Sequence, residues 1–186
     1  GTGSAPVVAQ AAKETGAVVI SVVTMPFECE KARIEKAEFG LQELRDVVDT
    51  VIVIDNNRLV DIAGQLPIQH AFAVANELIS TMIKGIVETI TLPSLINLYY
   101  ADVSAVMKKG EVAVIGIGES DTQTRAKDAV EKAINNPLLD VDIANASGVL
   151  VNIIGGPDMS LDEYRRIMEK IHKDLLIYIL YTWNQI

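Results

Sequence analysis

The stretch from Pro67 to Thr91 constrains the fold more than any other part of the chain. Its apolar residues recur at steps of three and four along PIQHAFAVANELISTMIKGIVETIT. This period predicts an α-helix with a wide apolar stripe, and Pro67 suits a first turn, where no N–H is needed. At about 1.5 Å per residue, the helix would cross a small domain. We expect a central helix buried on more than one side, with a half-domain on each flank. An ordinary core helix fits the periodicity equally well.

The remaining segments alternate between aliphatic runs and amphipathic stretches. Hydrophobic residues make up 49% of the 186 residues and aromatic residues only 5%, so the core must consist of Val, Ile, Leu and Ala. That composition favours an α/β fold with parallel strands covered by helices. Strands are expected at 17–25, 49–57, 111–120, 147–156 and 176–183. Helices are expected after Ser4, at 35–44, from about Asp102, at 122–136 and at 160–175. Gly16 would close the first helix, and Ser160 with Glu163 would form a capping box at the last.

Charge and composition narrow the classes of partner. A formal net charge of −9 argues against a nucleic-acid or anionic-membrane surface. The single Cys29 excludes an internal disulfide, and His70 and His172 lack the spacing of a zinc site. No apolar run is long enough to span a bilayer, and the first residues lack the pattern of a signal peptide. We expect a soluble cytoplasmic protein without direct membrane insertion.

Polar residues follow two of the expected strands. Glu30 and Arg33 come after the first strand, and Asn56 and Asn57 end the second. Ligands of open α/β sheets bind where strands end, so these side chains mark a candidate site. An exposed Glu30–Arg33 ion pair would contribute little, and an asparagine at this place is commonly a turn residue. An asparagine amide can also pair with the edge of a purine base.

The chain begins with Gly1, Thr2, Gly3 and Ser4, directly before an expected helix. Backbone N–H groups at the start of a helix can hold a phosphate, because the unpaired donors and the helix dipole both favour an anion. A glycine-rich N-terminus is also typical of a frayed chain end. The short turn therefore leaves both interpretations open.

Several stretches together resemble one known family over nearly the whole chain. They are GTGSAP (1–6), the segment 23–44, IDNNRL (54–59), AFAVANELI (71–79), LINLYYADVSAVM (95–107), GIGES and NNPLLDVDIANASGVLVNI. The sequence resembles FtsZ, the prokaryotic tubulin-like cell-division GTPase, and is most similar to the archaeal-like members. In that family the first five stretches are, in order, a phosphate loop, a ribose loop, a guanine contact, the start of the central helix, and a loop that reaches the next subunit's nucleotide. The last two stretches belong to the family's second domain.

The resemblance implies a partial Rossmann-like GTPase half, joined by a long central helix to a partial α/β C-terminal half of the tubulin/FtsZ type. The corresponding boundaries are a partial nucleotide-binding domain at 1–66, the central helix at 67–91, a synergy-type loop with a short helix at 92–109, and a partial C-terminal domain at 110–186. The cofactors implied are GTP or GDP with Mg²⁺, and no metal-binding side chain is assigned.

The resemblance also assigns roles to residues. Gly1, Thr2 and Gly3 would face the phosphates. Glu30 would bond the ribose, with Arg33 beside the nucleotide. Asn56 and Asn76 would read the guanine edge, and Phe72 would pack on the base. The expected nucleotide-binding residues are Gly1, Thr2, Gly3, Glu30, Arg33, Asn56, Phe72 and Asn76.

Catalysis would be completed across a subunit contact. Asp102 would enter the next subunit's site and orient the water that attacks the γ-phosphate, and Asn97 would support its loop. The implied partner is therefore another copy in a head-to-tail polymer, because a heterologous contact that does not close gives a filament.

Three departures from the family pattern bear on activity. Lys31 directly follows Glu30, where the family has a glycine, so the ribose loop is one residue shorter and the placement of Arg33 changes. Tyr99 stands at the first of two acidic positions, which leaves only Asp102. The segment after Asp174 lacks the family's proline-containing turn. We expect weakened hydrolysis.

The chain begins within a family motif, so a fragment is expected, lacking the family's first strands and a last strand. Such a chain would expose sheet edges and would pair with a copy as a dimer or by domain swapping. One hypothesis is a GTP-hydrolysing, filament-forming protein that is impaired in this chain. The alternative is a non-catalytic fragment that self-associates or caps filaments without GTP turnover. No nucleophile–base pair or metal cluster supports a third reading, an unrelated metabolic α/β enzyme.

Overall fold

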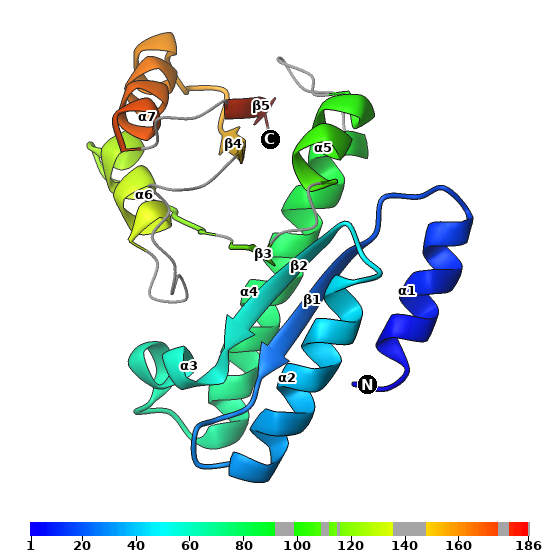
Figure 1. Ribbon diagram of the computed structural model, residues 1–186. Coiled ribbons are helices and arrows are strands. Elements are labelled where there is room, and N and C mark those ends of the chain that lie inside the picture. Colours follow the sequence, from blue (N-terminus) through cyan, green and yellow to red (C-terminus); the bar gives the residue numbers. More distant parts are fainter. Residues whose placement is uncertain (92–98, 109–111, 115, 136–147, 175–178, 186) are drawn as a thin grey trace. The chain divides into compact units, whose positions relative to one another are not determined.

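A computed structural model describes residues 1–91, 99–108, 112–114, 116–135, 148–174 and 179–185 (Figure 1). The chain divides into two compact units. Unit 1 contains residues 1–75 and 107–115, and unit 2 contains residues 76–106 and 116–186. The domain boundaries expected from the sequence remain predictions.

Unit 1 is built on a parallel three-stranded sheet of order β1-β2-β3. Its strands are β1 (Ile20–Met25), β2 (Thr50–Asp55) and β3 (Val112–Ala113), and its helices are α1 (Ala5–Glu14), α2 (Lys31–Arg45), α3 (Asn56–Ala63) and the first turns of α4 (Ile68–Thr91). The register pairs Ile20 with Thr50 and Met25 with Asp55. The carboxyl ends of β1 and β2 therefore lie side by side, and the chain leaves them for α2 and α3 (Figure 1).

The core of unit 1 is aliphatic, as the composition indicates. Its buried members come from α1, α2, the turn after α2 and β2, and they are Ala9, Leu44, Val48 and Val51. Leu41, Val19, Val23 and Val53 pack against them at the margin. The packing of α1 and α2 against the sheet fixes where α2 begins, and hence where the residues after β1 lie.

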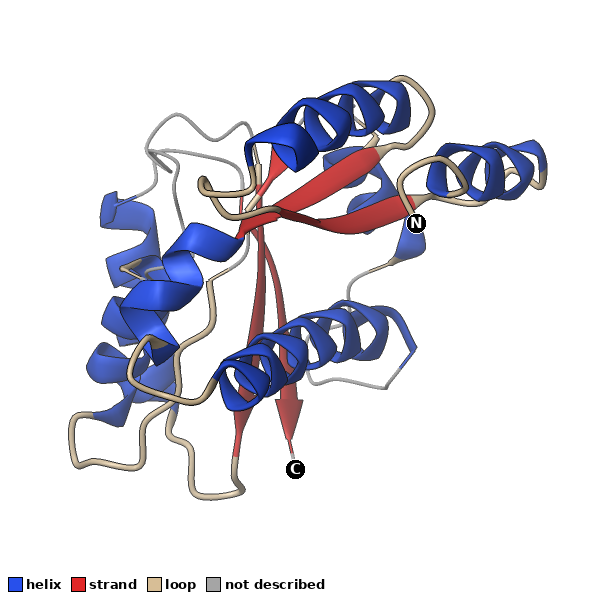
Figure 2. Ribbon diagram, turned by 90° about the horizontal axis from the view of Figure 1, so that it is seen from below, coloured by secondary structure: helices blue, strands red, loops and turns tan. Residues whose placement is uncertain are grey.

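Unit 2 contains most of α4, α5 (Tyr100–Met107), α6 (Arg125–Ile134), β4 (Val149–Gly155), α7 (Leu161–Asp174) and β5 (Ile179–Gln185). The strands β4 and β5 pair in parallel from Val149–Ile179 to Gly155–Gln185 and run side by side in Figure 2. The buried core of this unit joins α6, α7 and β4 through Val130, Ile153, Ile167, Met168 and Ile171.

Polar contacts connect the starts of α6 and α7. Arg125 Nε donates to Glu163 Oε1 at 2.6 Å and Arg125 Nη1 donates to Asp158 Oδ2 at 2.8 Å. The predicted capping box is present: Ser160 N donates to Glu163 Oε2 at 2.8 Å, and Glu163 N donates to Ser160 Oγ at 3.2 Å. Glu163 therefore caps α7 and also binds Arg125 at the start of α6.

Most sequence-predicted elements are confirmed with different bounds: the helix expected at 35–44 is the longer α2, and the strand expected at 111–120 is described only as Val112–Ala113. The helix expected at 67–91 is α4, Gly16 closes α1 with a positive φ of 81°, and the helix expected near Asp102 is α5. The second strand ends at Asp55, so the prediction that Asn56 and Asn57 end a strand is wrong. They begin α3, because Asp55 caps a helix there. No described helix combines the length and the apolar character that crossing a membrane requires.

The expectation that α4 is buried on more than one side is wrong for its described side chains. Among them only Met82 is buried, whereas Ile83, Val87 and Ile90 are 44%, 49% and 38% exposed. The described residues therefore cover only part of the apolar stripe of α4.

Candidate functional site

The junction between β2 and α3 is organised by one carboxylate. Asp55 is the N-cap of α3, and its Oδ1 accepts the Asn57 N–H at 2.8 Å. Aspartate is among the preferred N-cap residues because its side chain satisfies an otherwise unpaired helix donor. The neighbouring Asn56 is the first residue of the helix and is half-buried. The end of β2 therefore fixes the backbone that carries Asn56.

The loop after β1 ends with Glu30, and Arg33 lies in the first turn of α2. Glu30 precedes α2, and its Oε1 accepts the Phe27 N–H at 3.4 Å. Its other oxygen forms an ion pair with the Arg33 guanidinium, one turn further on and 76% exposed. The ion pair expected as one reading of these residues is present, and at this exposure it contributes little stability.

Phe72 lies where α4 meets this loop. Its ring contacts the ring of Phe27 edge to face, with centroids 6.1 Å apart and planes inclined by 66°. Phe72 remains 40% exposed, so part of its ring is free to pack on a ligand. Asn76 follows it by four residues on the same helix, and residues at that spacing lie on one face.

The N-terminal turn is exposed and lies against α2. Ala5 N donates to the Gly1 carbonyl at 2.9 Å, no side chain caps α1, and no acidic residue stands in its first turn. Thr2 lies close to Gly40, in the middle of α2, so the turn is about ten residues of helix away from Glu30. A hollow of about 400 Å³ beside the turn is lined by Thr2, Gly3, Glu35, Lys36, Phe39 and Glu43. Its two glutamates against one lysine do not favour a phosphate in the hollow itself.

Asp102 lies in unit 2, in the first turn of α5. Its Oδ2 accepts the Tyr99 N–H at 3.2 Å, and its own N–H donates to the Tyr99 carbonyl at 2.9 Å. The carboxylate thus closes the N-terminus of α5, as the acidic residue of a capping box does. Asn97, the second residue assigned to catalysis, lies outside the described residues.

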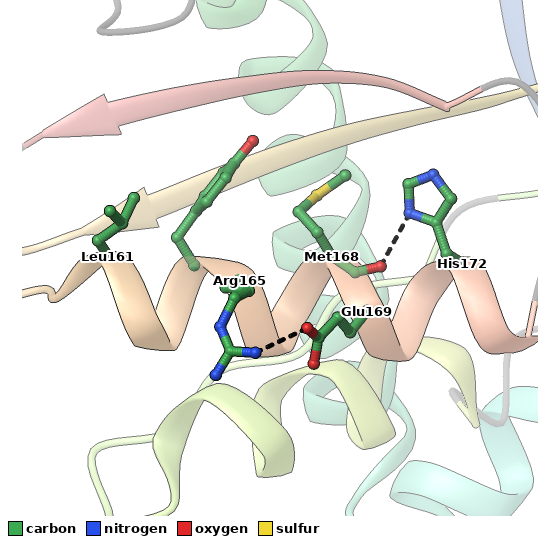
Figure 3. A pocket seen from close by; sticks show the side chains of 6 residues that line it. Leu161, Arg165, Met168, Glu169 and His172 are labelled. Atoms are coloured by element: carbon green, nitrogen blue, oxygen red, sulfur yellow. Dashed lines mark hydrogen bonds and ion pairs between the residues drawn. The ribbon is translucent and has the colours of Figure 1, made fainter.

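A second hollow, of about 490 Å³, lies along α7 (Figure 3). Leu161, Met168 and His172 project to one side of the helix, and Arg165 and Glu169 lie along the other. Arg165 pairs with Glu169 at 2.9 Å and with Asp162 at 2.6 Å, so its charge is already matched. None of the residues expected to bind nucleotide lines this hollow.

The structure brings the loop and first turn of α2 that carry Glu30 and Arg33 close to the start of α3 with Asn56, and Phe72 contacts the loop through Phe27. It places Gly1–Gly3 farther along α2. The roles of all eight binding residues remain predictions. Among the described residues, no group of three or more His, Cys, Asp or Glu side chains is placed to hold a metal ion.

The sequence analysis placed Asn57 at this edge but not its contact with the loop after β1, and it did not single out Phe27. Asn57 bonds to a backbone 29 residues away, so no local pattern reveals the contact. Phe27 meets Phe72 from another element. Asp55 did carry a signal, because an aspartate before an amphipathic stretch is typical of a helix start.

Two family models match the chain. The model of the Tubulin/FtsZ family GTPase domain matches residues 1–64, and that of the FtsZ family C-terminal domain matches residues 111–178. The chain belongs to the FtsZ family. Its fold is accordingly a partial tubulin/FtsZ fold, in which the long helix joins two α/β halves along the chain.

Curated and solved relatives agree with this assignment. The chain is 53% identical over 173 residues to the cell division protein FtsZ of Haloferax mediterranei, covering 92% of this chain and 46% of that protein. It is 53% identical over 178 residues to FtsZ 2 of Methanocaldococcus jannaschii, covering 94% and 47%. The chain thus spans about half the length of the curated FtsZ relatives it matches.

Solved structures match the whole chain. A mutant FtsZ of M. jannaschii superposes with a TM-score of 0.91 at 45% identity, covering 100% of this chain and 57% of that one. The GDP-bound monomer of CetZ1 from Haloferax volcanii gives a TM-score of 0.80 at 20% identity, covering 100% and 56%, a likeness of fold alone.

Proposed function

We propose that this chain carries the base- and ribose-binding part of the guanine-nucleotide site of an FtsZ-type cell-division GTPase. The observation that supports this most directly is the meeting of the loop after β1 with the start of α3, at the carboxyl edge of β1 and β2. The loop carries Glu30, α3 begins with Asn56, and Phe72 of α4 contacts the loop through Phe27. This edge is where open α/β sheets bind ligands.

Each group has a chemistry suited to one part of GTP or GDP. The half-exposed Phe72 ring offers a face for the base, and the amides of Asn56 and Asn76 can both donate to and accept from a guanine edge. The Glu30 carboxylate accepts hydrogen bonds from ribose hydroxyls. Binding there would loosen its ion pair with Arg33, whose exposed guanidinium could then turn toward the nucleotide.

The phosphates would be bound at the opening of α1, by backbone N–H groups of Gly1, Thr2 and Gly3. Because α1 has no capping side chain and no acidic residue in its first turn, its N-terminus suits an anion. Mg²⁺ would be bound through the phosphates and water, as is usual for this ion in nucleotide sites.

Hydrolysis in the complete protein would require a second subunit. Phosphoryl transfer depends mainly on positioning and on stabilising charge, so an acidic loop from the next subunit can complete a site. Asp102 would supply the carboxylate that orients water, in a head-to-tail polymer of identical chains. One solved relative is an FtsZ dimer from M. jannaschii, which supports self-association as the mode of assembly.

A non-catalytic, self-associating fragment is the second candidate. Two observations favour it: the Asp102 carboxylate is engaged in closing α5, and Tyr99 occupies the position of the family's other acid. The apolar stripe of Ile83, Val87 and Ile90 on α4 adds exposed surface of the kind that promotes association.

Calorimetric titration of the purified chain with GTP and Mg²⁺ tests the proposal. Saturable binding that Asn76→Ala removes and Asn135→Ala leaves intact would support it, because the Asn135 side chain donates to the Glu131 carbonyl of its own helix. Absence of binding at millimolar GTP would reject nucleotide binding by this chain and leave the self-associating fragment. Sedimentation of the same sample, with and without GTP, would then measure the association.

A further inference from the structure

We propose that Asn57 is a positioning residue of the nucleotide site, holding the ribose loop against the start of α3. The inference rests on the proposed function, since it concerns how the same edge is held in place. Asn57 was not among the expected binding residues, and its side chain is engaged by protein groups on both ends of the amide.

The side-chain amide of Asn57 connects the loop after β1 to the end of β2. Its Oδ1 accepts the backbone N–H of Glu28 at 3.0 Å, and its Nδ2 donates to Asp55 Oδ1 at 2.7 Å. Glu28 belongs to the loop after β1, and Asp55 ends β2. An asparagine is suited to this task because one amide offers an acceptor and a donor about 2 Å apart.

The contact reaches the proposed ligand groups on both sides. Toward α3, Asn57 is adjacent to Asn56. Toward α2, Glu28 lies between Phe27, which contacts the ring of Phe72, and Glu30, which would bond the ribose. Fixing the Glu28 backbone therefore limits the movement of the base and ribose contacts at once.

Helix capping alone does not account for the arrangement. Asp55 caps α3 through the backbone N–H of Asn57, and that bond does not involve the Asn57 side chain. The side chain could be removed without removing the cap. What it adds is the connection to Glu28, which serves the loop and not the helix.

The substitution Asn57→Ala removes the side-chain bonds to Glu28 and to Asp55, while alanine keeps the N–H that Asp55 accepts and has high helix propensity. The control is Asn135→Ala, which removes an asparagine bond to the Glu131 carbonyl at the end of α6. Cys29, the single and exposed cysteine, lies in the same loop and reports its exposure through the rate of reaction with a thiol reagent.

Three quantities are measured on the full chain: hydrogen exchange of the Glu28 amide, the Cys29 reaction rate, and the dissociation constant for GTP with Mg²⁺. Loss of the bond to the Glu28 backbone corresponds to about a three- to ten-fold effect. We expect Asn57→Ala to accelerate both loop measurements and to weaken GTP binding by that factor. Asn135→Ala should change none of them.

Unchanged Glu28 exchange and an unchanged Cys29 rate would overturn the inference whatever the nucleotide does. Faster loop exchange with wild-type GTP affinity in Asn57→Ala would also overturn it, because the connection would then hold the loop without positioning the site. Failure of the wild-type chain itself to bind GTP would reject the proposed function, and the positioning role with it. The two failures are distinguished by whether the wild type binds.

Discussion

Lys13 Nζ lies 2.7 Å from Asp49 Oδ1, although the two residues are 36 positions apart. Lys13 is in the last turn of α1, and Asp49 directly precedes β2. The same carboxylate accepts the Val19 N–H at 2.8 Å and is only 5% exposed. One buried carboxylate thus connects α1 to the entry points of β1 and β2.

Removing the lysine should destabilise unit 1. Lys13→Met would leave the Asp49 carboxylate buried with one charge-assisted hydrogen bond fewer, which costs about 2 kcal/mol. Urea denaturation followed by far-UV circular dichroism measures the change. Lys127→Met, which removes an exposed pair to Glu131 at 3.8 Å, should stay within about 0.5 kcal/mol of the wild type. Equal effects of the two substitutions would contradict a special role for the Lys13–Asp49 pair.

The stability that the Lys13–Asp49 pair contributes should decrease at acid pH. Burial favours the neutral form of Asp49, but the hydrogen bonds from Lys13 and Val19 outweigh burial and hold its pKa below the usual value. A lowered pKa in the folded chain gives stability that is present above the unfolded-state pKa and is lost as pH falls through the folded-state value.

Glu163, in unit 2, should make a second contribution to stability that is lost in acid. Hydrogen bonds from Arg125, and then from Ser160, lower its pKa from 4.5 to about 2. Its contribution to stability is therefore complete above about pH 5 and disappears as pH falls toward 2. In thermal melts over this range, the melting temperature of Glu163→Gln should fall less steeply than that of the wild type. Parallel curves would show that Glu163 does not titrate in this window.

Substitution by alanine should have opposite effects on stability at two glycines of unit 2. A Cβ at Gly118 would lie 2.6 Å from the Ala133 nitrogen, against the backbone of α6, whereas a Cβ at Gly85 on α4 would meet only Asn152 Nδ2 at 3.7 Å. Gly118→Ala should destabilise the chain by about 1–3 kcal/mol because backbone must move. Gly85→Ala should stabilise it by about 0.5–1 kcal/mol through helix propensity. Denaturant midpoints measure both, and stabilisation by Gly118→Ala would show that residue 118 has room for a side chain.

The elements that the sequence predicted correctly are those with local signals. The α4 helix follows from its own period, and α7 begins where Ser160 and Glu163 have capping-box spacing. The sequence does not predict α3, because the aliphatic run up to Asp55 indicates a strand that continues into Asn56 and Asn57. Asp55 is in fact both the last residue of β2 and the N-cap of α3, so it fits the pattern of a strand end and that of a helix start.

The candidate site was predictable only in part, for a physical reason. Glu30 and Asn56 follow two strands, so parallel pairing alone places their loops at one edge. The contacts from Asn57 to Glu28 and from Phe27 to Phe72 join residues far apart in sequence, and no periodicity encodes them. Likewise, the α4 pattern identifies Ile83 and Val87 as apolar but does not say whether another element covers them.

The substitution Asp102→Asn separates the two roles of Asp102, which are closing the N-terminus of α5 and catalysing hydrolysis. Asparagine at this position keeps an oxygen that can accept the Tyr99 N–H but removes the charge that would orient the attacking water. The test requires a chimera in which this chain replaces the matching segment of FtsZ 2 from M. jannaschii, assayed for phosphate release at polymerising concentration. We expect Asp102→Asn to retain helical content and polymer while lowering turnover at least about 100-fold, in the range of a lost catalytic proton acceptor. Tyr99→Asp should raise turnover by adding a second carboxylate. Turnover by Asp102→Asn equal to that of the parent chimera would limit Asp102 to its structural role at the start of α5.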